Sequence, residues 1–191
     1  WVAEAGMKLK IGDNGQLMFG AAYNEFDIAG RTPLFGAEED FYGNSFVLNP
    51  ITDELEFKYD YRMFHAFGEY KFKLGGKSMV LFADYVVNSD ADENDTGYLA
   101  GVKYGSAKKQ GTWDLTYFYE KLEADAVIGL VTDSDFGGGG TDAKGHVFSG
   151  TYAIQDNWAF KATYFLNEIN LASGEPIDYD RMQLDLSFKF K

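Results

Sequence analysis

The sequence predicts an all-β fold, an antiparallel up-and-down transmembrane β-barrel, to which these 191 residues contribute nine strands as a single domain. Three observations support this prediction. Apolar and polar side chains alternate with a period of two, the pattern of strands with two different faces. Short and long connections between the strands follow one another in strict alternation. Aromatic side chains gather at both ends of the apolar face.

Each predicted strand shows the alternation. Residues 181–190 show it best, because Met182, Leu184 and Leu186 alternate with Arg181, Gln183 and Asp185. In chain order the nine strands lie near 2–11, 16–26, 64–73, 78–87, 98–104, 112–120, 148–152, 158–167 and 181–190. The strand at 148–152 is the shortest. The apolar face of all nine carries no charge except Glu25, so we expect it to face an apolar environment.

The connections between these strands come in two lengths. The short ones are 12–15, 74–77, 106–111 and 155–157, and the long ones are near 27–60, 88–96, 123–145 and 168–180. Outer-membrane barrels place short turns at the periplasmic end and long loops outside. A soluble β-sandwich also alternates apolar and polar residues, but its connections have no reason to keep this order.

The aromatic side chains of the apolar face are sorted towards the strand ends. Near the short turns these are Phe19, Tyr70, Phe72, Tyr104, Trp113, Tyr152, Trp158, Phe188 and Phe190. Near the long links they are Tyr23, Phe64, Tyr85, Tyr98, Tyr119 and Phe148. Mostly Ala, Leu, Val and Gly lie between. Two such girdles are expected where rings sit at the headgroups of a bilayer, whereas ordinary core aromatics would not be sorted to strand ends.

Composition excludes several functions. The chain has no cysteine, so disulfides and thiolate chemistry are absent. A net charge of −13 argues against nucleic acid as a partner. The two histidines, His65 and His146, lack the spacing and company of a catalytic or metal-binding set. We therefore expect no enzyme and no cofactor. The glycine run 137–140 fits the start of a calcium-binding repeat, but it occurs once, and a flexible or pore-facing loop is favoured.

The number of strands suggests that they are part of a larger barrel. If the long links are extracellular, Trp1 starts outside and the last strand ends in the periplasm. Bacterial barrels have even strand numbers with both termini in the periplasm. We therefore expect these strands to be the C-terminal half of a 16-stranded barrel, which would need about 340 residues.

From Phe67 onward the chain carries several distinctive stretches: FGEYKFKLGG, LFADYVVNSDADENDTGYLAGVKYG, LEADAV, TDSDFGGGGTDAKGHVFSGTYAI and DYDRMQLDLSFKF. Together they resemble a family of bacterial "putative porins". The resemblance implies a gram-negative outer-membrane pore, 16-stranded and homotrimeric, embedded in outer-membrane lipid and lipopolysaccharide. Passive diffusion of small hydrophilic solutes or ions is then the expected function. Two alternatives remain open: a plugged barrel with a structural or adhesive role, and a secreted soluble β-sandwich that binds a ligand.

The polar face of the strands supplies the candidate pore-lining residues. These are Glu4, Lys8, Lys10, His65, Glu69, Lys71, Lys73, Asp84, Lys103, Asp114, Glu120, Lys161, Arg181, Asp185 and Lys189. The four long links carry 21 Asp/Glu and 3 Lys/Arg, whereas the rest of the chain carries 9 and 14. One hypothesis is an acidic outer vestibule that leads to a more basic periplasmic half. The alternative is that the acidic loops only bridge lipopolysaccharide through divalent cations.

The 27–60 link is too apolar for a freely solvated loop, since it contains Phe35, Phe41, Phe46 and Leu48. We predict that it folds inward as a constriction. The polar face offers side chains that could receive it: Phe67, Val80, Phe82, Val86, Phe118 and Phe165. Packing against a neighbouring protomer is the competing explanation.

Overall fold

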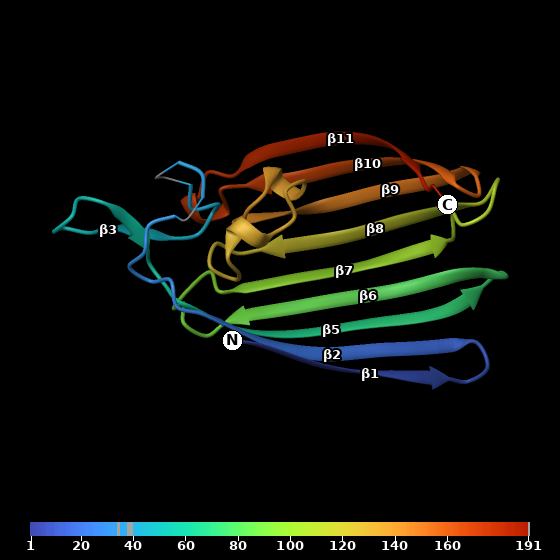
Figure 1. The fold of residues 1–191 in the computed structure, drawn as a ribbon, viewed down its shortest axis with the longest axis horizontal. Coiled ribbons are helices and arrows are strands. Elements are labelled where there is room, and N and C mark those ends of the chain that lie inside the picture. The colour runs from blue at the N-terminus through green and yellow to red at the C-terminus, as the bar shows by residue number, and fades with distance from the viewer. Residues whose placement is uncertain (34, 38–39, 191) are drawn as a thin grey trace.

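A single large sheet dominates the computed structural model, which describes residues 1–33, 35–37 and 40–190 (Figure 1). Nine strands pair in chain order, each antiparallel to the next. They are β1 (Val2–Ile11), β2 (Gly15–Phe26), β5 (Tyr61–Leu74), β6 (Lys77–Asn88), β7 (Thr96–Gly105), β8 (Trp113–Leu122), β9 (Ala143–Gln155), β10 (Trp158–Ile169) and β11 (Ile177–Phe188). The prediction of nine antiparallel strands is confirmed.

The remaining elements are small. Strands β3 (Phe46–Leu48) and β4 (Leu55–Phe57) form a separate hairpin within the 27–60 link. Three single turns of 3-10 helix follow later in the chain: η1 (Gly129–Val131), η2 (Phe136–Gly138) and η3 (Leu171–Ser173). In the described part of the chain, no helix is long and apolar enough to cross a membrane.

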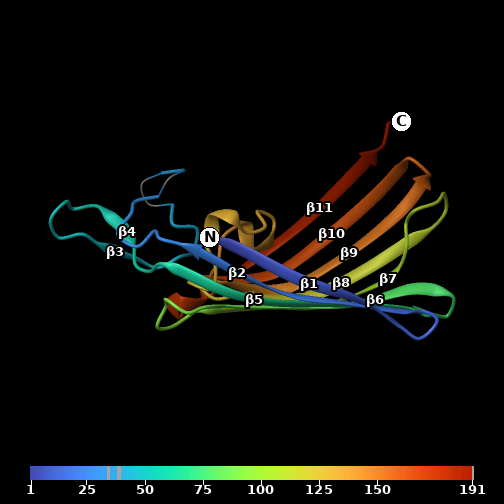
Figure 2. The same ribbon diagram turned by 60° about the horizontal axis from the view of Figure 1, so that its bottom comes forward.

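The large sheet is open over the described residues, because β1 and β11 are its two edges and each pairs on one side only. A closed barrel and its strand number therefore stay predictions. Figure 2 shows that the sheet is curved, with the 123–142 segment lying on the concave side. The β3–β4 hairpin instead projects beyond the ends of the strands.

Connections alternate as predicted, with every short turn at one end of the sheet and every long link at the other (Figure 1). The turn between β5 and β6 contains only Gly75 and Gly76, both with positive φ (59° and 78°), as a type I′ two-residue hairpin loop requires. Several strands extend past their predicted ends. At the long-link end, β9 begins at Ala143, β10 continues to Ile169 and β11 begins at Ile177, so the last long link shortens to 170–176.

The convex face is apolar and exposed. Leu81, Leu115 and Leu184 lie on this face, and the Leu184 side chain is 59% exposed. A β-sandwich would cover such a face with a second sheet. The only further sheet among the described residues is the two-stranded β3–β4 hairpin, which lies at the strand ends. The soluble sandwich therefore does not fit this architecture.

Aromatic side chains of the convex face contact one another at both ends of the strands. At the short-turn end, ring centroids lie 5.2 Å apart for Tyr70–Phe72, 6.0 Å for Tyr104–Trp113 and 4.2 Å for Trp158–Phe188. At the long-link end, the separations are 5.1 Å for Tyr23–Phe64 and 6.0 Å for Tyr98–Tyr119. Ring pairs at both ends are what two girdles require, although their place at lipid headgroups stays a prediction.

One prediction about the convex face is wrong. Beyond Glu25, the face also carries charge at its long-link end, where Lys144 Nζ lies 3.0 Å from Glu168 Oε2 and Lys121 occupies the neighbouring position on β8. The reason is that β8, β9 and β10 extend past the predicted strand ends. Long charged side chains at this level can reach polar surroundings beyond an apolar band.

Candidate functional site

The candidate site is the concave face of the sheet. Fourteen of the fifteen side chains predicted to line a pore belong to strands, and the ladder register places all fourteen on this one face. The fifteenth, Lys189, follows the end of β11, where its backbone N–H donates to the Asn157 carbonyl oxygen at 2.9 Å. The structure thus brings these residues onto a common surface, while contact with a pore remains a prediction.

Basic residues dominate this surface near the short turns. Lys10, Lys71 and Lys103 lie in one cross-strand row, with Lys73 and Lys161 nearer the turns. Two carboxylates, Asp114 and Asp185, lie in the same cross-strand row as Lys161, the row nearest the short turns. Lys103 Nζ forms an ion pair with Asp114 Oδ1 at 3.1 Å, which fixes the orientation of both side chains.

Nearer the long links the same surface is acidic. Asp84 and Glu120 belong to one row, separated only by Leu99 of β7. Adjacent strands lie about 4.8 Å apart, so the two backbones are about 10 Å apart. Asp84 Oδ1 lies 3.5 Å from His65 Nδ1, a pair that carries opposite charges only when the imidazole is protonated. Glu120 makes no ion pair with any residue that the structure describes.

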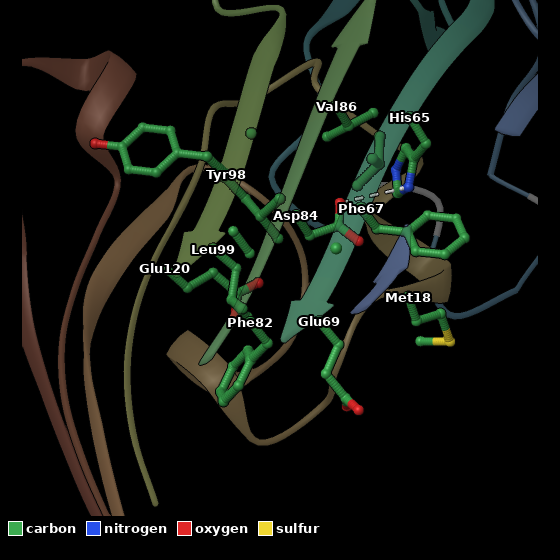
Figure 3. A pocket seen from close by; sticks show the side chains of 15 residues that line it. Met18, His65, Phe67, Glu69, Phe82, Asp84, Val86, Tyr98, Leu99 and Glu120 are labelled. Atoms are coloured by element: carbon green, nitrogen blue, oxygen red, sulfur yellow. Dashed lines mark ion pairs between the residues drawn. The ribbon is translucent and has the colours of Figure 1, made fainter. Parts of the chain in front are cut away.

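These carboxylates border a cavity of about 480 Å³ on the concave face (Figure 3). In Figure 3, Asp84 faces His65, whereas Tyr98 points away from the other labelled side chains. The walls are otherwise mostly apolar: Met18, Phe67, Phe82, Val86, Leu99, Leu122 and Val127. Val127 is the contribution of the 123–142 segment, so this segment forms one side of the cavity.

The tip of the 123–142 segment is anchored to the sheet by Phe136. Its side chain is only 2% exposed and packs with Ala143, Val147 and Phe165, with Phe118 at the border of this cluster. Polar contacts support the same position: the Gly137 N–H donates to Asn167 Oδ1 at 3.2 Å, and Arg181 pairs with Asp135 at 2.9 Å. The segment therefore lies on the concave face and does not extend away from it.

The neck of the segment, residues 124–129, packs on a second cluster of apolar side chains. Ala126 and Ile128 are buried against Tyr61, Met63 and Val86, which lie on the concave face of β5 and β6. At the C-terminal end of the 123–142 segment, Asp142 Oδ1 accepts a hydrogen bond from the Ala172 N–H at 2.8 Å. Burial raises the pKa of the Asp142 carboxyl, and the backbone N–H groups of Ala172 and Leu171 partly offset this rise.

A profile of the family described as "Putative porin" matches residues 47–190. The chain belongs to this family. The resemblance seen from Phe67 onward is thus confirmed, and the matched region begins earlier, inside β3. No curated protein matches the chain. A porin family implies a pore-forming role in an outer membrane, which agrees with a curved sheet that is apolar on its convex face and charged on its concave face.

The prediction that the 27–60 link folds inward over the concave face of the sheet is wrong for most of the link. Its aromatic residues pack with one another: the ring centroid of Phe41 lies 4.9 Å from those of both Phe46 and Phe57. Of the side chains expected to receive this link, Phe165 belongs to the cluster that contains Phe136 of the 123–142 segment, and Phe118 packs against the same cluster. Among the described residues of the link, only Ile28, at its start, packs on the cluster that contains Val86.

The glycine run 137–140 in the 123–142 segment has a steric role. Gly137, Gly138, Gly139 and Gly140 all have positive φ, which L residues rarely adopt. A Cβ on Gly137 would lie 2.9 Å from the Ala143 Cβ, and one on Gly140 would overlap the Tyr42 carbonyl oxygen. Over the described residues, no three His, Asp or Glu side chains converge in a way that could hold a metal ion. The run therefore serves close packing against the sheet and the 27–60 link.

Sequence reasoning missed the 123–142 segment as the inward element, although a signal was present. Ala124, Ala126, Ile128 and Phe136 are apolar residues within an acidic link, and all four are buried. The glycine run and the aspartates drew attention to solvation and calcium instead. The polar residues that join this segment to the 27–60 link gave no local signal, because their partners lie 80 or more residues away.

Proposed function

We propose that this chain is part of an outer-membrane porin through which small hydrophilic solutes or ions diffuse passively. The observation that carries the proposal is the contrast between the two faces of one curved sheet. A face of exposed Leu, Phe and Tyr suits lipid, whereas a face of Lys, Asp and Glu suits water. In this proposal the protein carries out no chemistry and needs no cofactor.

The two free edges of the sheet support the proposal that the barrel closes. Unpaired backbone groups on β1 and β11 cannot remain exposed within a bilayer, because hydrocarbon offers no hydrogen-bond partners. We propose that further strands of a longer chain complete a barrel of about 16 strands. A homotrimer embedded in outer-membrane lipid and lipopolysaccharide is part of the same proposal.

Within the pore, the 123–142 segment would narrow the passage beside Asp84 and Glu120. Solutes entering from the long-link end would first meet acidic loops, then these two carboxylates, and finally the lysine rows near the short turns. Charge of one sign in a cleft concentrates counter-ions and raises their entry rate. The proposal is therefore a passage whose outer part favours cations and whose inner part is basic.

One observation favours the alternative of a plugged barrel. The 123–142 segment already occupies part of the concave face, and further strands of the closed barrel would bring more side chains towards it. A plugged barrel would have a structural or adhesive role. Its convex face would be identical, so only transport separates the two functions.

Single-channel recording tests the proposal. We expect the full-length protein that contains this chain to give stable conductance steps in a planar bilayer, grouped in threes if it is a trimer. Silence from folded, heat-modifiable protein would favour the plugged barrel and would leave the fold unchanged. A leak without defined steps would also count against a porin.

The proposed lipid contact can be tested on two adjacent residues of β11. Replacing the outward-facing Leu184 with Arg should destabilise the folded protein by about 2–4 kcal/mol, because hydrocarbon cannot solvate the guanidinium. The matched control is Gln183→Arg, on the concave face, which should change stability by less than about 1 kcal/mol. Denaturant unfolding of the full-length protein in lipid vesicles measures both. Equal losses at the two positions would argue against lipid on the convex face.

A further inference from the structure

The contacts between the two long links point to Asn44 as the residue that positions the 123–142 segment. We propose that Asn44 holds the neck of this segment, residues 124–129, in place and so sets the width of the passage beside Asp84 and Glu120. The inference rests on the proposed porin function for its effect on transport. Its structural part concerns only how one link holds another.

Asn44 makes three strong hydrogen bonds to a segment far away in the chain. Its Nδ2 donates to the carbonyl oxygens of Ala124 at 2.7 Å and Val127 at 2.8 Å. Its Oδ1 accepts from the Gly129 N–H at 2.8 Å. The side chain is only 3% exposed, so water does not offer these three backbone groups an easy alternative.

The amide of Asn44 is suited to this position because it both donates and accepts. Aspartate has a similar shape, but its carboxylate has no donors and would face two carbonyl oxygens. Alanine would leave the Val127 carbonyl and the Gly129 N–H without this partner, and the Ala124 carbonyl would keep only the Thr141 hydroxyl, at 2.7 Å. Buried unpaired polar groups are costly. Either substitution should therefore favour conformations in which the neck moves away to reach water.

Neighbours of Asn44 hold the same neck and the end of the segment. The Ser45 N–H donates to Asp125 Oδ1 at 2.9 Å, and the Tyr61 hydroxyl donates to the same oxygen at 3.0 Å. The Thr141 N–H donates to the Tyr42 carbonyl oxygen at 2.8 Å. Residues 42–45 thus lie between the two ends of the 123–142 segment and bind both of them.

The backbones of the two links approach closely at three glycines. A Cβ on Gly43 would lie 2.6 Å from the Thr141 carbonyl oxygen. A Cβ on Gly129 or Gly140 would overlap the Tyr42 carbonyl oxygen. Such contacts leave no room for the links to slide past each other while the Asn44 hydrogen bonds are intact, so the neck has one well-defined position.

The position of the neck matters because Val127 forms one side of the cavity that contains Asp84 and Glu120. Phe136 anchors the tip of the segment separately, seven residues beyond the end of the neck. Loss of Asn44 should therefore free the neck while the tip stays attached. The expected result is a passage that fluctuates between widths, and not a passage that is permanently wide.

Two measurements on the full-length protein test this inference. In planar bilayers, Asn44→Ala and Asn44→Asp should both increase transitions between conductance levels by about tenfold. In hydrogen exchange, the amides of residues 126–131 should exchange about tenfold faster in both variants, while those of β8 and β9 keep their wild-type rates. The matched control is Asn49→Ala, because the hydrogen bonds of the Asn49 side chain to described residues stay within its own link. Its Nδ2 donates to Glu56 Oε1 at 2.8 Å, and its Oδ1 accepts from the N–H groups of Ile51 and Thr52.

Each outcome has a distinct meaning. Steady wild-type-like currents and unchanged exchange in both Asn44 variants would overturn the inference. The same result in Asn49→Ala as in Asn44→Ala would also overturn it, since any change in the link would then suffice. A silent wild-type channel with faster exchange in the Asn44 variants would refute the porin function but support the positioning role. Exchange that rises equally in β8 and β9 would mean general destabilisation and would contradict a local effect.

Discussion

Replacing Phe136 with Ala is expected to raise the single-channel conductance of the full-length protein and to lower its stability by about 3–5 kcal/mol. The ring is almost completely buried between the 123–142 segment and the concave face, where it contacts Val147 and Phe165. Truncation removes the main apolar contact of the tip and leaves a cavity. Without that anchor, the tip should leave the concave face and widen the passage.

Val131→Ala is a suitable control for this experiment. Val131 belongs to the same segment, in η1, but its side chain is 75% exposed, so its removal should change stability by less than about 0.5 kcal/mol. Conductance in planar bilayers and unfolding in lipid vesicles measure the two effects. An unchanged conductance in Phe136→Ala, despite the stability loss, would mean that the segment does not narrow the passage.

Neutralising the two carboxylates of the cavity should change ion selectivity. In the double variant Asp84→Asn, Glu120→Gln, we expect the preference for cations over anions to fall by about threefold or more, because both charges act at the proposed narrow part of the passage. The reversal potential under a salt gradient measures this change. The effect should shrink at high salt, where exposed charges are screened over a few ångströms.

The control for selectivity removes the same number of charges elsewhere. Asp13 lies in the turn after β1, and Asp178 lies on the convex face of β11. The double variant Asp13→Asn, Asp178→Asn should leave the reversal potential within experimental error. If both double variants shifted it equally, total charge would matter and the position of Asp84 and Glu120 would not.

Much of the architecture was predictable because strand patterning is local. Side chains of a strand alternate between two faces, so a run such as Arg181–Met182–Gln183–Leu184 shows which residues share a face without any knowledge of neighbouring strands. Connection lengths then order the strands, since short turns join antiparallel neighbours. The same reasoning placed Asp84 and Glu120 on one face, where the structure has them.

Strand ends were less predictable. Lys121, Lys144 and Glu168 lie outside the predicted strands, yet the ladder includes them. Pairing with a neighbouring strand determines where a strand stops, and the sequence of one strand does not contain that information. The charged rim of the convex face was missed for this reason.

The sequence by itself determined the strands, their two faces, their order and the family. Only the tertiary structure decided which long link covers the concave face. Both candidates are acidic and both contain apolar residues, so composition could not separate them. The choice depends on how Phe136 fits between Val147 and Phe165, and on how Asn44 meets the backbone of residues 124–129. Such fits involve residues far apart in the chain, and they exist only once the strands have brought the links together.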